Sequence, residues 1–222
     1  EGNAINFAVG SSEVEFDGVI GGGTNGGLGA ITITGALDLD NTLTSAASLS
    51  VSTTSNLGAD VTTTGTQTYT GATTLSGGDR TLTGTTVNFG STLTGTGSHD
   101  LTVTGNLDLD GALTSVVDLS VSGTSNLGAN VTTSGTQTYT GATTLSGGDR
   151  TLTGTTVNFG STLTGTGSHD LTVTGNLDLD GALTSVVDLS VSGTSNLGAN
   201  VTTSGTQTYT GATTLSGGDR TL

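Results

Sequence analysis

The chain has 222 residues, with 39 glycines and no proline, cysteine, methionine or tryptophan. Its 18 carboxylates and three arginines give a net charge of −15, which argues against nucleic acid as a partner because a phosphate backbone needs a positive surface. The absence of cysteine excludes a disulfide framework, and no apolar run is long enough to span a membrane. If the protein is secreted, we expect its signal upstream of Glu1.

Residues 1–30 are predicted to form the divergent first coils of a repetitive fold. The segment Val14–Gly18 resembles Thr86–Gly90, and a glycine-loaded turn over residues 21–27 leads into the alternating Ile31–Gly35. Because the spacing of these glycine-closed strands continues downstream, we expect no linker and one continuous domain over residues 1–222.

The rest of the chain is a tandem array. Residues 81–150 and 151–220 are identical, residues 31–80 are a partial variant of the same unit, and residues 221–222 begin the unit again. Interchangeable units favour a function that depends on length, surface or mechanics rather than on one unique site.

Within each unit a short strand closed by glycine recurs. It ends at Gly90, Gly105, Gly123, Gly141 and Gly160, with successive spacings of 15, 18, 18 and 19 along the chain. These spacings predict four coils per unit, each of roughly 15–19 residues, with about three short strands in each coil. Leucine and valine alternate with threonine, serine and aspartate, as in strands with one buried face.

Stacking equivalent strands, such as Leu101–Val103 beneath Leu119–Val121, predicts an all-β, right-handed parallel β-helix (β-solenoid). Phe89 and Tyr139 are expected in its narrow core. With a rise of ~4.8 Å per coil, each unit would add roughly 19 Å, and about a dozen coils would make a rod of about 60 Å.

The segment Thr64–Val87 resembles the β-strand repeats of large bacterial exoproteins, namely filamentous-haemagglutinin-like adhesins and autotransporter passengers. The similarity extends over essentially the whole chain. It implies a right-handed parallel β-helix at the bacterial cell surface or outside the cell, exported by two-partner or type V secretion. It also implies a role in adhesion, extracellular matrix or aggregation.

Calcium is the one metal for which the sequence contains candidate ligands, and no other cofactor is expected. The run Leu107–Gly111 and its copies place two carboxylates beside a glycine, as in part of a calcium loop. In a strand, however, alternate residues point outward ~7 Å apart, so they do not converge on one ion without help from another coil. The candidate ligands are Asp108, Asp110, Asp118, Asp178, Asp180 and Asp188.

The remaining polar motifs favour structural roles. We expect Asp79-Arg80, Asp149-Arg150 and Asp219-Arg220 to turn corners and pair across neighbouring coils. The lone histidines His99 and His169 are expected in turns, each beside the aspartate that follows it. The sequons at Asn130 and Asn200 carry little weight in a bacterial protein. Interruptions in the threonine pattern argue against an ice-binding face.

These observations predict a protein that is not an enzyme, because aromatic platforms and basic residues are scarce. We expect a structural subunit or shaft segment of an extracellular or cell-surface fibre that associates end to end or laterally. The alternative is an adhesin module that contacts glycans, other cells or neighbouring fibres through its outward threonine, serine and aspartate side chains.

Overall fold

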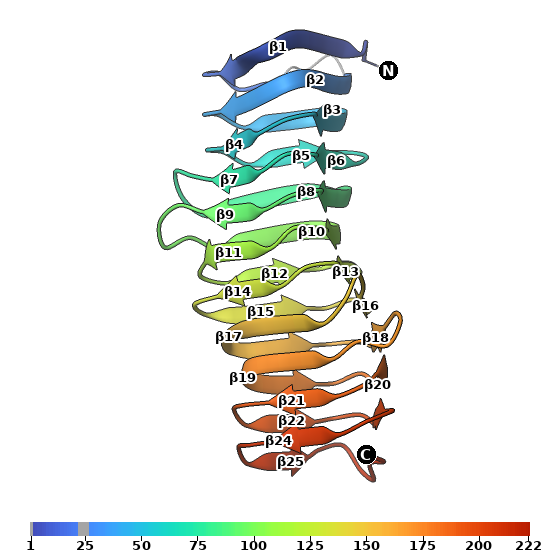
Figure 1. Ribbon diagram of the computed structural model, residues 1–222. Coiled ribbons are helices and arrows are strands. Elements are labelled where there is room, and N and C mark those ends of the chain that lie inside the picture. Colours follow the sequence, from blue (N-terminus) through green and yellow to red (C-terminus); the bar gives the residue numbers. More distant parts are fainter. Residues whose placement is uncertain (1, 22–26) are drawn as a thin grey trace.

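A computed structural model describes residues 2–21 and 27–222. The described chain is a single stack of parallel strands that runs from β1 at one end to β25 at the other, as Figure 1 shows. The described residues contain no α-helix, so none of them forms a helix able to cross a bilayer. The predicted glycine-rich turn over residues 21–27 lies mostly outside the described residues.

The stack contains 25 strands, most of them three or four residues long. In chain order they are β1 (Ile5–Phe16), β2 (Leu28–Leu39), β3 (Leu43–Val51), β4 (Ser55–Leu57), β5 (Val61–Thr63), β6 (Gln67–Tyr69), β7 (Thr73–Leu75), β8 (Arg80–Phe89), β9 (Leu93–Gly95), β10 (Leu101–Leu109), β11 (Leu113–Val116), β12 (Leu119–Val121), β13 (Ser125–Leu127), β14 (Val131–Thr133), β15 (Thr136–Tyr139), β16 (Thr143–Leu145), β17 (Arg150–Phe159), β18 (Leu163–Gly165), β19 (Leu171–Leu179), β20 (Leu183–Val186), β21 (Leu189–Val191), β22 (Ser195–Leu197), β23 (Val201–Thr203), β24 (Gln207–Tyr209) and β25 (Thr213–Leu215).

The parallel β-solenoid predicted from the sequence is confirmed. Each coil has three sides, and each side pairs only with the same side of the coils before and after it. Leu101 and Val103 lie in register with Leu119 and Val121, as the alternation predicts. Long strands such as β10 bend around a corner and contribute to two sides, because one half pairs with β12 and the other half with β13. The right-handed winding remains a prediction from chain chirality.

The three sides are followed through the strand register from coil to coil. Side A contains residues 31–33, 49–51, 67–69, 87–89, 107–109, 125–127, 143–145, 163–165, 183–186 and 201–203. Side B contains residues 37–39, 55–57, 73–75, 93–95, 113–116, 131–133, 150–153, 171–174, 189–191 and 207–209. Side C contains residues 43–46, 61–63, 80–83, 101–104, 119–121, 136–139, 156–159, 176–179, 195–197 and 213–215.

The coils are longer than the glycine spacing predicts. From residue 31 onward, paired residues on successive coils are 17 to 21 positions apart, and most are 18 to 21 apart, as in Leu101↔Leu119 and Leu82↔Val103. The shortest predicted coil, from Gly90 to Gly105, is not a coil. Gly90 follows the side A half of β8, whereas Gly105 follows the side C half of β10, so the two glycines lie on the same coil.

The 70-residue unit is therefore not a whole number of coils. From residue 80 to residue 149 it contains eleven strand segments: the two halves of β8, β9, the two halves of β10, and β11 to β16. Eleven segments at three per coil make three and two-thirds coils instead of four. Each unit is consequently rotated by one third of a turn from the last, and Gln67, Gln137 and Gln207 lie on sides A, C and B.

The solenoid has about 10 turns, fewer than the dozen predicted, because the true coils are longer. At ~4.8 Å per coil the rod rises by roughly 48 Å, and each unit adds roughly 18 Å. A given side chain returns to the same side of the rod only after three units, or eleven coils.

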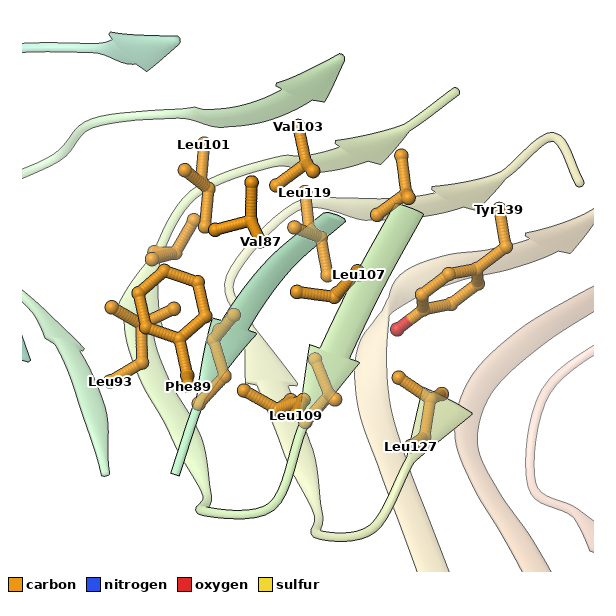
Figure 2. Packing of buried hydrophobic residues seen from close by; sticks show 14 of the residues in the cluster. Val87, Phe89, Leu93, Leu101, Val103, Leu107, Leu109, Leu119, Leu127 and Tyr139 are labelled. Atoms are coloured by element: carbon orange, nitrogen blue, oxygen red, sulfur yellow. The ribbon is translucent and has the colours of Figure 1, made fainter. Parts of the chain in front are cut away.

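One continuous apolar core runs along the axis. It contains the inward residues of all three sides, including Leu101, Val103 and Phe89, each at most 1% exposed. Figure 2 shows these side chains converging from neighbouring strands, with Tyr139 directed inward from the next part of the stack. Tyr139 stacks on Phe159 of the following coil, with ring centroids 5.2 Å apart and an interplanar angle of 15°. The predicted burial of Phe89 and Tyr139 is confirmed.

A polar pair that the sequence pattern did not reveal lies within this core. The Tyr139 hydroxyl donates to Gln137 Oε1 at 3.0 Å, and Gln137 Nε2 donates to the carbonyl oxygens of Val131 and Thr153 at 3.3 and 2.8 Å. Both side chains are fully buried, and burial raises the pKa of Tyr139. A buried amide whose hydrogen bonds are satisfied fixes the register of the coils it joins.

Candidate binding surface

The outward surface of the rod is organised into polar ladders that run parallel to its axis. Asp108, on side A, accepts a hydrogen bond from Asn126 Nδ2 one coil later at 2.8 Å. Asn126 Oδ1 in turn accepts from the Ser146 hydroxyl at 2.8 Å. Asp178 accepts in the same way from Asn196, at 2.8 Å. These carboxylates point outward, as predicted, and each bonds to the neighbouring coil of its own chain.

A second ladder follows one corner of the rod. Asp79 Oδ1 accepts from the backbone N–H of Asp100 at 3.0 Å, and Asp100 Oδ1 accepts from the N–H of Asp118 at 3.1 Å. Asp118 Oδ1 accepts from both the N–H and the hydroxyl of Thr136, at 2.5 and 3.0 Å. Asp188 repeats the last contact with Thr206. The sequence suggests Asp118 only as a calcium ligand, and its role in capping the next coil was not predicted.

The six calcium candidates are not brought together on one ion-sized site. Asp110 and Asp180 are exposed, whereas Asp108 and Asp178 accept hydrogen bonds from Asn126 and Asn196, and Asp118 and Asp188 accept from Thr136 and Thr206. Among residues 2–21 and 27–222, the one group of three acidic or histidine side chains with ligand atoms within 4.8 Å of one another is different. It contains the exposed residues Glu15, Asp17 and Asp40.

In the acidic group of Glu15, Asp17 and Asp40, the neighbouring carboxylates change the pKa of Glu15. Asp17 has the largest effect on Glu15 and raises the pKa of its carboxyl group, with smaller contributions from burial, Asp38 and Asp40. Glu15 and Asp17 lie on the first coil and Asp40 on the second. The like charge of Asp17 on the same coil is therefore the main cause of the shift, and those of Asp38 and Asp40 on the next coil add to it. An exposed acidic cluster by itself defines no ligand site.

We expect calcium to leave the stability of the rod unchanged. A site filled at a hundred times its dissociation constant would add about 2.7 kcal/mol. The candidate carboxylates instead accept hydrogen bonds or lie apart, so the melting temperature should be the same in millimolar calcium and in excess chelator. Melting followed by circular dichroism checks this, with magnesium as the control for ionic strength. A calcium-specific rise in the melting temperature would contradict it.

The arginines occupy corners, and Arg80 reaches the previous coil as predicted. Its Nη1 lies 3.6 Å from Asp60 Oδ1, and its Nε donates to Gly78 O at 3.2 Å. In the next unit asparagine replaces this aspartate at position 130. Burial lowers the pKa of Arg150, and the adjacent Asp149 carboxylate opposes that effect.

Asn130→Asp is expected to raise the free energy of unfolding by up to about 1 kcal/mol, because it recreates the Arg80–Asp60 pair around Arg150. The Thr151 N–H, which donates to Asn130 Oδ1 at 2.9 Å, keeps an acceptor, just as Thr81 does with Asp60. Urea unfolding measures the gain. In a double-mutant cycle with Arg150→Gln the gain should disappear, and a gain that persists would assign it to another cause.

The histidines occupy corner turns. His99 Nδ1 lies 3.8 Å from Asp79 Oδ1, on the preceding coil, and His169 lies at the same distance from Asp149. The expected partner was the following residue, Asp100 or Asp170, so that detail is wrong. The corner brings the carboxylate of the preceding coil closer to the ring. Because the units are rotated, the two histidines face different directions.

The remaining surface carries shallow hollows. One hollow of about 220 Å³ lies beside Ser115 and is lined by Gly97, Ser98, Val117 and Thr132, among others. Its counterpart beside Ser185 measures about 250 Å³. Both hollows adjoin a serine with a φ of 60°. Asn130 and Asn200, the sequon residues, accept backbone hydrogen bonds from the following coil.

Comparison with known proteins gives no relative for this chain: no family model, no curated protein and no solved structure matches it.

Proposed function

We propose that this protein is a structural subunit or shaft segment of an extracellular fibre. The observation that carries the proposal is the direction of its polar contacts. Outward aspartate, asparagine, serine and threonine side chains bond along the axis to the next coil, as in the ladder from Asp108 through Asn126 to Ser146. Side chains that bond along the axis link each coil to the next, and these links support a stiff rod. Because each coil contacts only its neighbours, the number of coils sets the length of the rod.

The high negative charge supports the same function. A net charge of −15 with three cationic side chains keeps neighbouring rods apart and soluble. The apolar side chains are almost all inside: Val19, Leu215 and Leu222 are the large apolar residues that are more than half exposed among those described. All three lie in or beside the end coils, so the long sides of the rod offer little apolar surface to a partner.

The location of this fibre, at or outside a bacterial cell surface, is proposed from the resemblance of residues 64–87 to exoprotein repeats.

The rotation of successive units by one third of a turn argues against the alternative function as an adhesin. A ligand-binding motif in the unit would face three directions in three successive units, so one flat receptor surface would meet only every third copy.

The shaft and the adhesin are separated by two measurements on the 222-residue chain and on chains that differ from it in the number of 70-residue units. Electron microscopy of chains with one, two or three copies of the 70-residue unit should show rods that lengthen by roughly 18 Å per unit at constant width. Binding to glycan arrays and to bacterial cells should be absent. Saturable binding of a glycan or of bacterial cells, seen in chains with one, two and three units alike, would overturn the shaft function and favour the adhesin.

A further inference from the structure

Two corners of the rod have the same contacts but a different charge. Arg80 and Arg150 occupy equivalent places, and each donates from Nε to the carbonyl oxygen of the glycine two residues earlier at 3.2 Å. Beside Arg80 lies the Asp60 carboxylate, 3.6 Å from Nη1. The equivalent residue beside Arg150 is the neutral Asn130. At residue 150 the chain therefore keeps the arginine without the carboxylate that balances its charge.

Arg150 is shielded from water although it is charged. It is 8% exposed, and a Cβ on Gly148 would lie 3.1 Å from its Nη2, so the glycine turn packs against the guanidinium. Within residues 2–21 and 27–222, no carboxylate oxygen lies within 4.0 Å of an Arg150 nitrogen. The adjacent Asp149 instead accepts from the N–H of Asp170 at 3.0 Å. Shielded charges in proteins are normally compensated by an opposite charge.

Asn130 adds further donors beside this guanidinium. Its Oδ1 accepts from the Thr151 N–H at 2.9 Å, just as Asp60 Oδ1 accepts from the Thr81 N–H at 2.9 Å. That hydrogen bond orients the amide, so Nδ2 takes the place of the second carboxylate oxygen of Asp60. Where the first corner presents an acceptor, the second corner therefore presents N–H donors next to a cation.

We propose that a small monovalent anion, chloride, binds between the Arg150 guanidinium and the Asn130 amide and compensates the charge as Asp60 does at Arg80. Both groups donate N–H hydrogen bonds, and those from the guanidinium are charge-assisted. The place is open to solvent, because Asn130 is exposed and the Asp60 side chain is 49% exposed. The net charge of −15 repels anions, so we expect a weak site with a dissociation constant of ~100 mM.

Melting in two sodium salts at the same ionic strength tests the site, because the screening of surface charges is then the same. Replacing about 0.5 M gluconate, a bulky anion, by chloride should raise the melting temperature of the unchanged chain by roughly 2–4 °C. Asn130→Asp should lose this rise because its carboxylate takes the place of the anion. Arg150→Gln should lose it because the cation is gone.

Thr114→Asp is the matched control for the added charge, because Thr114 is exposed on the side of the rod and far from this corner. It should keep the full chloride-specific rise. If Arg150→Gln fails to fold, Asn130→Asp still decides the question, since it reproduces the Asp60 corner that the chain already contains.

Crystals grown in bromide locate the anion. Anomalous diffraction should place a bromide ion beside Arg150 Nη1 and Asn130 Nδ2, and none beside Arg80, where Asp60 supplies the negative charge. This measurement uses the unchanged chain and does not depend on the folding of any variant.

The outcomes decide the proposal. A chloride-specific rise that Asn130→Asp abolishes and Thr114→Asp keeps, together with bromide at Arg150, supports the site. The same rise in all chains, or no rise in the unchanged chain, overturns it. Bromide at Arg150 without a chloride-specific rise would indicate an adventitious ion only and would also overturn it. The shaft function is tested separately, by rod length and glycan binding.

Discussion

Replacing Tyr139 by alanine is expected to lower the free energy of unfolding by about 3–5 kcal/mol, the range for deleting a large aromatic side chain from a core. Tyr139 is fully buried, stacks on Phe159 and donates its hydroxyl to Gln137. The substitution therefore leaves a cavity beside the Phe159 ring and an unpaired amide oxygen in the core. Urea unfolding, followed by far-ultraviolet circular dichroism, measures the loss.

The chain supplies a matched control for this prediction. Tyr209 occupies the same place in an identical sequence and makes the same hydroxyl contact, to Gln207 Oε1 at 2.9 Å. It lies in the last coil, where no ring covers it, so Tyr209→Ala should cost far less. Equal losses from the two substitutions would contradict the view that stability comes from contact with the next coil.

The second large effect is expected at a corner glycine. Gly105 has a φ of 134°, and a Cβ built on it would lie 1.9 Å from the carbonyl oxygen of Gly84 on the preceding coil. Gly105→Ala should therefore lower the free energy of unfolding by at least about 3 kcal/mol, through backbone strain and displacement of one coil from the next. Urea unfolding and hydrogen exchange of the flanking strands measure the size and location of the effect.

Gly160→Ala is the matched control, because Gly160 also follows a strand but has no positive φ and its nearest contact would be an ordinary 3.4 Å. It should change the free energy of unfolding by less than about 1 kcal/mol. A comparable loss at both glycines would show that any corner side chain is harmful and that close approach at Gly105 is not the cause.

The corner at Gly105 also explains the glycine spacing seen in the sequence. The carbonyl of Gly84 would meet a Cβ on Gly105, the carbonyl of Gly105 would meet one on Gly123, and that of Gly123 would meet one on Gly141. Along this edge each backbone passes close to the one below it. These glycines are therefore valid markers of successive coils, whereas Gly90, which was grouped with them, belongs to another side.

Strand alternation predicts which side chains of the candidate surface point outward, but it does not predict the hydrogen bonds that these side chains make. Alternation correctly placed Asp108 outward, because successive side chains in a strand face opposite sides. It contained no information on Asn126 or Ser146, which reach the Asp108 ladder from later coils. The group of Glu15, Asp17 and Asp40 was missed for the same reason, since Asp40 belongs to the next coil.

The kind of fold could be predicted from the amino-acid pattern: alternating leucine and valine with glycine-marked corners allows only short strands, and equivalent strands one coil apart predict parallel stacking. The way in which the 70-residue unit maps onto the coil could not, because its strand segments are nearly interchangeable and any of them can occupy any side. Only the register, as between Gln137 and Val157, shows that eleven segments fill three and two-thirds coils. Backbone hydrogen bonds between coils therefore turn identical sequences to face three different directions.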